Sequence, residues 1–246
     1  MADGGRGETF LARCSVDPGV FALRPDYRVV LVAAEGLVGG PTDETSDALL
    51  REAESTAQVL LSHQPLEGLD SVAAWRDAYR AFGAKPQRTR NSLEALLRRA
   101  ASGLPRVNRL TDLYNAVSVR HLLPLGGEDL DRYAGPARLA RASGDEPFET
   151  VAGGDVSIEH PEPGEVVWCD DEGVTCRRWN WRQTRRTRLK DDTTAALFVL
   201  EALDPMPDQA LAAAAADLVD HLNAFAPRAR IARRLIDAPS RGGRPC

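Results

Sequence analysis

Cysteine and histidine are scarce in this chain of 246 residues, and neither is grouped along the sequence. The four cysteines, Cys14, Cys169, Cys176 and Cys246, have no metal-ligand spacing, and the four histidines do not cluster. A structural zinc site needs such groups of ligands, and a disulfide framework is typical of short chains that are rich in cysteine. We therefore expect reduced thiols and no bound metal ion.

Long apolar runs and the common catalytic motifs are also missing. No stretch approaches the roughly 18 uninterrupted apolar residues of a membrane span, and residues 1–6 lack the apolar core of a signal peptide. The sequence contains no G-x-S-x-G, no phosphate-binding G-x-x-x-x-G-K-[ST], no G-x-G-x-x-G and no H-E-x-x-H. We expect a cytoplasmic protein that has no membrane contact and no cofactor.

A strongly basic run stands out from an acidic background. The net charge of the chain is -5, yet residues 177–190 hold seven cations and no acid, with Trp179, Asn180 and Trp181 among them. Arginines bind phosphates and indoles stack on bases, so this pattern suits a nucleic-acid ligand. It equally suits an exposed strand on which arginine stems lie against tryptophan faces.

Two further basic segments, residues 76–99 and 228–244, are separated from acidic ones such as residues 159–171. Such segregation allows a basic face on an acidic protein, which local phosphate binding requires. The alternative is a chance cluster of exposed arginines.

The apolar pattern predicts helices first and strands later. Apolar residues recur at helical spacing over residues 42–63, 69–82, 92–100, 110–122 and 208–225. Buried strands are expected over residues 29–34 and 195–201, a hairpin over 165–176, and a further strand around Phe21 and Leu23. We expect an α+β fold in one domain, residues 1–227, followed by a basic, flexible tail over residues 228–246.

The predicted helix over residues 110–122 and the turn after it carry a family resemblance. Asp112, Asn115 and Val117 form D-x-x-N-x-V, Pro124 and Leu125 begin a P-L-x motif, and D-L-D follows at residues 129–131. These motifs resemble the B3/B4 editing domain of bacterial phenylalanyl-tRNA synthetase β subunits. Residues 82–86, 92–99 and 179–182 resemble freestanding relatives of that domain, and the resemblance covers about residues 70–203.

The resemblance implies an α+β fold with a closed β-barrel and hydrolysis of an amino acid wrongly esterified to tRNA. It places the family's pocket asparagine on Asn115, but its histidine falls on Gly126. The family's glutamate, which reads the tyrosine hydroxyl, falls near Thr184 or Arg185, where the sequence has no acid. These departures put tyrosine specificity in doubt and leave deacylation possible.

The resulting hypothesis is a deacylase that acts in trans on the aminoacylated 3′ end of a tRNA. Asn115, Asn180 and Gln183 would orient the aminoacyl group or a water, and Trp179 or Trp181 would stack on the terminal base or form a wall of the pocket. The remaining assignments are cations that would bind phosphates: Arg178, Arg182, Arg185, Arg186, Arg80, Lys85, Arg88 and Arg90.

Several alternatives stay open. The fold could bind tRNA or another RNA without hydrolysis, which the glycine at position 126 favours, or it could bind a free amino acid or a related small molecule. Asp112, which shares the predicted helix with Asn115 and His121, could cap a pocket or could simply make helix-capping or core hydrogen bonds.

Overall fold

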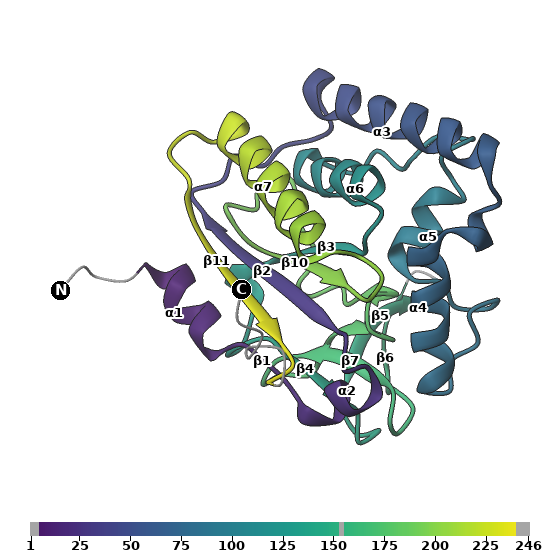
Figure 1. Ribbon diagram of the computed structural model, residues 1–246. Helices are drawn as coiled ribbons and strands as arrows, with labels where there is room; N and C mark the ends of the chain where they lie inside the picture. The colour runs from purple at the N-terminus through teal and green to yellow at the C-terminus, as the bar shows by residue number, and fades with distance from the viewer. Residues whose placement is uncertain (1–4, 153–154, 240–246) are drawn as a thin grey trace.

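The computed structural model describes residues 5–152 and 155–239, and a four-stranded antiparallel sheet lies at its centre (Figure 1). The strand order is β11 (Arg230–Asp237), β2 (Arg28–Glu35), β10 (Ala195–Ala202) and β3 (Leu125–Asp129). The middle strands β2 and β10 are almost entirely buried along their lengths, as their continuous apolar sequences predict.

Alternate residues of the central sheet enter two different cores, because successive side chains of a strand point to opposite faces. Val32 and Phe198 belong to one core, together with apolar residues of the helices α6 (Arg109–His121) and α7 (Asp208–Phe225). Leu31 and Val199 belong to the other. Figure 1 shows α6 and α7 on the same side of the sheet, with α3 (Glu44–His63) beyond α6.

The other face of the central sheet packs against a second, five-stranded sheet. Its order is β1 (Ser15–Val16), β4 (Arg138–Arg141), β7 (Val166–Cys169), β8 (Val174–Arg177) and β9 (Arg182–Gln183), and only the pairing of β1 with β4 is parallel. Leu139, Val166 and Trp168 of this sheet join Leu31 and Val199 in one core. A separate hairpin consists of β5 (Phe148–Ala152) and β6 (Asp155–Glu159).

Shorter helical segments complete the described part of the chain. They are α1 (Arg6–Arg13), α2 (Pro18–Leu23), α4 (Asp70–Ala81), α5 (Ser92–Leu97) and the 3-10 turns η1 (Leu66–Gly68) and η2 (Leu130–Arg132). Among the described residues, none of the helices combines the length and the apolar character needed to cross a membrane.

The α+β class is confirmed, but three expectations about local structure and topology are wrong. The strands of the described residues form three open sheets and no closed barrel. Phe21 and Leu23 lie in helix α2, where Pro18 at the first helical position fixes a backbone angle suited to helix. The segment expected to be a flexible tail contains β11, paired with β2 along its whole length; residues 240–246 lie outside the described part.

Candidate functional site

A cavity of about 300 Å³ lies where the two sheets meet helices α5 and α6. It is lined by Ser92, Ala95, Leu96, Arg99, Pro105, Tyr114, Asn115, Leu125, Gly126, Glu128, Trp168, Cys176, Trp179, Asn180, Trp181, Arg182, Gln183, Val199 and Glu201. Segments far apart in the sequence therefore supply one site, and its apolar and aromatic walls with a few polar groups are typical of ligand pockets.

The structure brings half of the predicted site residues to this cavity. Those that line it are Asn115, Gly126, Trp179, Asn180, Trp181, Arg182 and Gln183. Those that do not are Arg178, Arg185, Arg186, Arg80, Lys85, Arg88 and Arg90.

Asn115 reaches the cavity from the middle of α6 and is 7% exposed. Its carboxamide makes no hydrogen bond to another described residue. The helix that carries it begins at Asn108, whose side-chain oxygen accepts from the backbone N–H of Thr111 at 2.9 Å. The nitrogen and oxygen of this amide are not sealed within the protein, so they border the open space of the cavity. Asn115 is thus available to a ligand.

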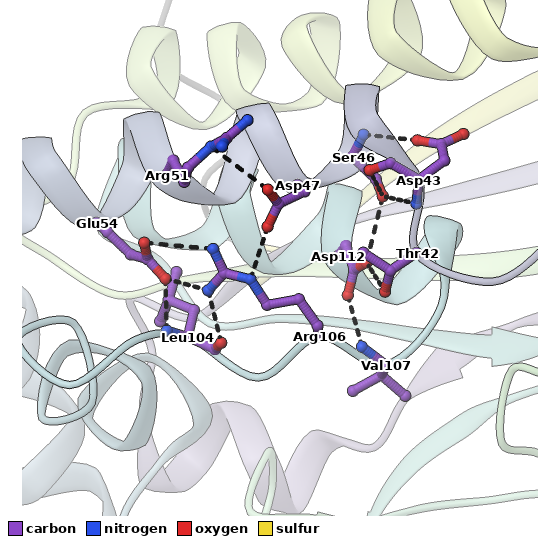
Figure 2. A network of polar contacts seen from close by, with 10 residues as sticks. All are labelled: Thr42, Asp43, Ser46, Asp47, Arg51, Glu54, Leu104, Arg106, Val107 and Asp112. Carbon is purple, nitrogen blue, oxygen red and sulfur yellow. Dashed lines mark hydrogen bonds and ion pairs between the residues drawn. The ribbon is translucent and has the colours of Figure 1, made fainter.

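A polar network fixes the start of α6 next to the cavity (Figure 2). The buried Asp112 carboxylate accepts from the backbone N–H of Val107 at 2.8 Å and from the Thr42 hydroxyl at 2.6 Å. It also accepts from the hydroxyl of Ser46, on the first turn of α3, at 3.3 Å. Asp112 therefore makes core hydrogen bonds that join α6 to α3, and it is not among the residues that line the cavity.

The same network holds the loop that contains Pro105, a lining residue. Figure 2 shows Arg106 between Asp47 and Glu54 of α3, and the guanidinium nitrogen Nε lies 2.8 Å from the Asp47 carboxylate. Glu54 also accepts from the backbone N–H of Leu104 at 2.6 Å. The wall of the cavity on this side is thus anchored by ion pairs on the far side of the loop.

A tight turn between β8 and β9 forms another wall. Arg178 and Trp179 have positive φ angles of 47° and 68°. Residues other than glycine rarely adopt this backbone conformation. The backbone N–H of Trp179 donates to the carbonyl of Val166 at 2.6 Å, and the Asn180 carbonyl accepts from Ser92 at 3.0 Å. The turn is therefore held against both β7 and the start of α5, and such strained backbone is often found at functional sites.

The two tryptophans of this turn have different environments. Trp179 is fully buried and packs edge-on against Tyr27 and Trp75 at ring-centroid distances of 5.2 and 5.4 Å. It therefore forms a wall of the cavity and presents no exposed face for a base. Trp181 is half-buried, and the guanidinium of Arg178 lies 4.6 Å from its ring centroid.

Asn180 is held by hydrogen bonds at both ends of its amide. The Tyr79 hydroxyl donates to Oδ1 at 2.9 Å, and Nδ2 donates to Oε2 of Glu201 at 2.8 Å. Glu201 also accepts at Oε1 from the Tyr27 hydroxyl at 2.7 Å and from Nε1 of Trp168 at 3.2 Å. Asn180 thus belongs to a fixed polar network in the cavity wall.

Two buried carboxyls in the cavity wall escaped the sequence analysis. Glu128 on β3 and Glu201 on β10 are 3% and 2% exposed. Burial raises the pKa of each from 4.5 to about 7; hydrogen bonds from Tyr133 to Glu128 and from Asn180 to Glu201 oppose the rise, and repulsion from a nearby acid, Asp170 for Glu128 and Glu128 for Glu201, adds to it. The sequence does contain a signal for Glu201, which is the one charged residue in the otherwise apolar strand β10. Glu128 lies in the short strand β3 beside a second acid, Asp129, and has no comparable signal.

The side chain of Gln183 lies directly against Gly126 in the cavity wall. Nε2 of Gln183 donates to the carbonyl of Gly127 at 3.0 Å, and a Cβ atom placed on Gly126 would lie 3.3 Å from that same nitrogen. The amide of Gln183 therefore covers the position at which the family resemblance places a histidine. Gln183 and Asn115 therefore supply the side-chain amide N–H groups that could donate to a ligand carbonyl in this cavity.

The predicted phosphate-binding cations fall into two groups. Arg186 makes a two-pronged ion pair with the buried Asp170, with nitrogen–oxygen distances of 2.9 and 2.7 Å, and Arg80 pairs with Asp77. Arg178 lies 3.6 Å from Glu165, Arg182 3.7 Å from Glu159, and Arg90 3.7 Å from Glu94. Among the described residues, the exposed cations Lys85, Arg88 and Arg185 make no ion pair, and neither does Arg99 at the cavity.

The structure describes no metal centre. Within residues 5–152 and 155–239, no three or more side chains of His, Cys, Asp or Glu are placed to hold a metal ion. The thiol of Cys176, which lines the cavity, is fully buried, and burial raises its pKa well above the usual value of a cysteine.

A family model for the B3/4 domain matches residues 74–216 of the chain. This chain is a member of the B3/4 domain family. The matched residues include every lining residue of the cavity, from Ser92 to Glu201, so the candidate site lies within the B3/4 domain.

The chain is also similar to several solved structures, one of which carries a related description. It is an N-terminal fragment of the phenylalanyl-tRNA synthetase β-subunit from Pyrococcus horikoshii, 15% identical, with a TM-score of 0.44. The alignment covers 89% of this chain and 49% of that one, so the B3/4 protein spans about half the length of the fragment. No curated protein matches the chain.

Proposed function

We propose that this B3/4 protein hydrolyses the ester bond between a wrongly attached amino acid and its tRNA, acting in trans. The observation that carries the proposal is the Asn115 carboxamide, which has no hydrogen-bond partner among the described residues, inside a cavity of a B3/4 domain that opens to solvent. A cavity of about 300 Å³ is of the size that takes a small ligand group such as an aminoacyl ester.

The reaction needs a water that attacks the ester carbonyl and donors that stabilise the resulting oxyanion. The amide nitrogens of Asn115 and Gln183 are the candidate donors, and a donor aimed at such an oxyanion contributes roughly 3 kcal/mol of transition-state stabilisation. The ester bond then breaks with the electron pair on the ribose oxygen, which takes a proton from water or from the neighbouring ribose hydroxyl. Asn180 acts here through Glu201 and the cavity wall, since both ends of its amide are bound.

Acids on other strands could take the part of the family's glutamate, which has no counterpart at residues 184 and 185. Residues 184 and 185 are threonine and arginine, but Glu128 and Glu201 line the cavity. A carboxyl at this depth can bind a hydroxyl-bearing side chain, so a tyrosyl ester belongs among the substrates to be tested.

The tRNA body would contact exposed cations of the domain, of which Arg99 lies at the cavity. Lys85, Arg88, Arg99 and Arg185 are exposed, and none of them makes an ion pair within the described part of the chain. Because phosphate contacts release counterions, tRNA affinity should fall steeply with salt, by about one power of the salt concentration for each phosphate contact. Arg99→Ala and Arg185→Ala should weaken binding of all tRNAs alike and reduce this slope.

The proposal is tested with a panel of mischarged tRNAs, including tyrosyl and other noncognate species, and the purified protein. Turnover of one or a few species supports editing and identifies the substrate. Failure to turn over any species contradicts the proposal.

A second candidate, a tRNA-binding module without hydrolysis, is favoured by the glycine at position 126. Gln183 covers this glycine, so the histidine of the resembling domain has no counterpart there. Salt-sensitive tRNA binding without turnover would support this candidate. Binding of a free amino acid that is insensitive to salt would instead support a small-molecule site.

A further inference from the structure

The cavity wall contains two buried carboxyls that have no cationic partner. Among the described residues, no lysine or arginine lies within ion-pair distance of Glu128 or Glu201. Other buried acids of this protein are treated differently: Glu94 pairs with Arg76 at 2.7 Å, and Glu165 pairs with Arg177 at 2.8 Å. Glu94 and Glu165 thus have a counter-charge, whereas Glu128 and Glu201, like the buried Asp112 and Asp129, have only neutral hydrogen-bond donors within the described part of the chain.

Hydrogen bonding distinguishes the two carboxyls. Glu201 accepts from three donors, the side chains of Tyr27, Trp168 and Asn180. Glu128 accepts at Oε2 from the hydroxyl of Tyr133, and the hydroxyls of Thr175 and Thr187 act on it as weaker donors that no hydrogen bond of ordinary geometry holds in place. A carboxylate has about four lone-pair sites, so Glu128, with one well-formed hydrogen bond against three at Glu201, keeps the greater capacity to accept a further donor.

The charged form of both groups is disfavoured by burial and by repulsion from a nearby acid, Asp170 for Glu128 and Glu128 for Glu201. A cation inside the cavity would reverse both effects, because an opposite charge at close range favours ionised carboxylates. Tyr114 and Trp168 also line the cavity, and aromatic rings attract cations. The unpartnered carboxamide of Asn115 in the same cavity independently indicates a polar ligand.

We propose that the cavity receives an ammonium group of its ligand, and that Glu128 is the residue that binds it. The inference rests on the proposed function in that the ligand is an aminoacyl group. The ammonium is then either the α-amino group, common to all amino acid esters, or an amine of the side chain. The experiment separates these two sources.

The test uses four amides of 3′-amino-3′-deoxyadenosine, which mimic the aminoacylated end of tRNA and cannot undergo ester hydrolysis. The acyl groups share one carbon skeleton: hexanoyl carries no amine, norleucyl only the α-amine, 6-aminohexanoyl only the terminal amine, and lysyl both. Calorimetry at one fixed pH gives the affinity of each for the wild-type protein and for Glu128→Gln.

We expect at least one amine-bearing ligand to bind about tenfold to hundredfold more tightly than the hexanoyl amide, the size of a hydrogen bond to a charged group. A gain with norleucyl identifies the α-ammonium, and a gain with 6-aminohexanoyl identifies a side-chain amine. Glu128→Gln should abolish the gain and leave hexanoyl binding within a few-fold of wild type. The wild-type comparison stands even if the variant does not fold.

Equal affinity for all four ligands would overturn the proposal, as would absence of binding by all four. An amine preference that persists in folded Glu128→Gln would overturn the role of Glu128. The proposed hydrolysis fails separately: mischarged tRNAs that are not turned over, with the amine preference intact, contradict editing and leave the ammonium site supported.

Discussion

At the scale of single residues, the hydrogen bonds of Asn180 hold the cavity wall in place. Its amide joins the Tyr79 hydroxyl to the carboxyl of Glu201, and all three side chains are buried. Removal of the amide leaves a buried hydroxyl without its acceptor and a buried carboxyl without one of its donors. Each lost partner of this kind costs about 1–3 kcal/mol.

Asn180→Ala should therefore lower the free energy of unfolding by about 2–6 kcal/mol in urea denaturation. The expected cause is the loss of the two hydrogen bonds, so Tyr79→Phe, which removes only one, should cost less. A larger loss in Tyr79→Phe than in Asn180→Ala would show that the amide is not the centre of this network.

The adjacent glycines of β3 offer a matched pair of substitutions. A Cβ on Gly127 would lie 2.9 Å from Leu189 and from the ring of Tyr114, whereas on Gly126 it meets Nε2 of Gln183 at 3.3 Å. Gly127→Ala should thus destabilise the protein by about 1–3 kcal/mol through overpacking. Gly126→Ala should cost clearly less and act mainly on ligand binding, because the flexible Gln183 side chain can move.

Thermal unfolding and ligand affinity of both variants check this prediction. Equal destabilisation by the two substitutions would mean that Gln183 cannot move and belongs to the rigid core.

At the scale of the elements, a buried ion pair joins β8 to the start of β7. The Arg177 guanidinium binds both oxygens of Glu165, with nitrogen–oxygen distances of 3.0 and 2.8 Å, and the two side chains are 7% and 3% exposed. The same carboxylate accepts from the backbone N–H of Arg178 at 3.1 Å. The pair thereby fixes the turn that carries Trp179 and Asn180 into the cavity.

Arg177→Met should lower the free energy of unfolding by about 3 kcal/mol, because the buried Glu165 loses its two-pronged partner and keeps only Arg178, 3.6 Å away, as a counter-charge. The control is Arg80→Met, which breaks the exposed pair with Asp77 and should cost no more than about 1 kcal/mol. Urea denaturation of both variants measures the difference. Similar small losses would show that Glu165 is protonated or solvated in the variant at little cost.

The sequence predicts most elements and only part of their arrangement. Apolar spacing located α7, the long helix α3 and the strands β2 and β10, because each buries a regular stripe or a continuous run. Apolar spacing did not predict β11, because four of its eight residues are charged. This strand is held by its pairing with β2. Long-range pairing of this kind has no local signal.

The candidate site was predicted in part for the same reason. Asn115 was predicted from a sequence motif and Gln183 from the basic run around it. Glu128 and Glu201 were not predicted, because they become candidate site residues only through their burial in the folded cavity wall. Likewise, only the folded structure separates Arg186, bound to Asp170, from exposed cations such as Arg185.

At the scale of the whole molecule, Glu128 and Glu201 make stability depend on pH. The folded-state pKa of each is about 7, above the ordinary value of 4.5. The folded protein therefore keeps protons that the unfolded chain releases between pH 4.5 and about 7, so these groups lower the free energy of unfolding as pH rises through this interval. The shift of each group corresponds to roughly 3 kcal/mol.

Glu128→Gln and Glu201→Gln should each flatten the dependence of unfolding free energy on pH over this interval. The difference in unfolding free energy between variant and wild type should therefore shift in favour of the variant from pH 5 to pH 8. The reason is that glutamine cannot ionise, so the variant escapes the loss of stability that the wild type suffers as pH rises. Urea denaturation at a series of pH values measures the effect. An unchanged slope in both variants would mean that neither carboxyl titrates in this range in the folded protein.

The most direct test of the central claim is a comparison of hydrolysis and tRNA binding in Asn115→Ala. Single-turnover deacylation of the substrate found in the panel is measured beside tRNA affinity and unfolding free energy. If the cavity around Asn115 is the site of ester hydrolysis, the rate falls about hundredfold or more while tRNA affinity changes only a few-fold. If rate and affinity fall together with stability, Asn115 is structural and the hydrolytic role of this cavity is contradicted.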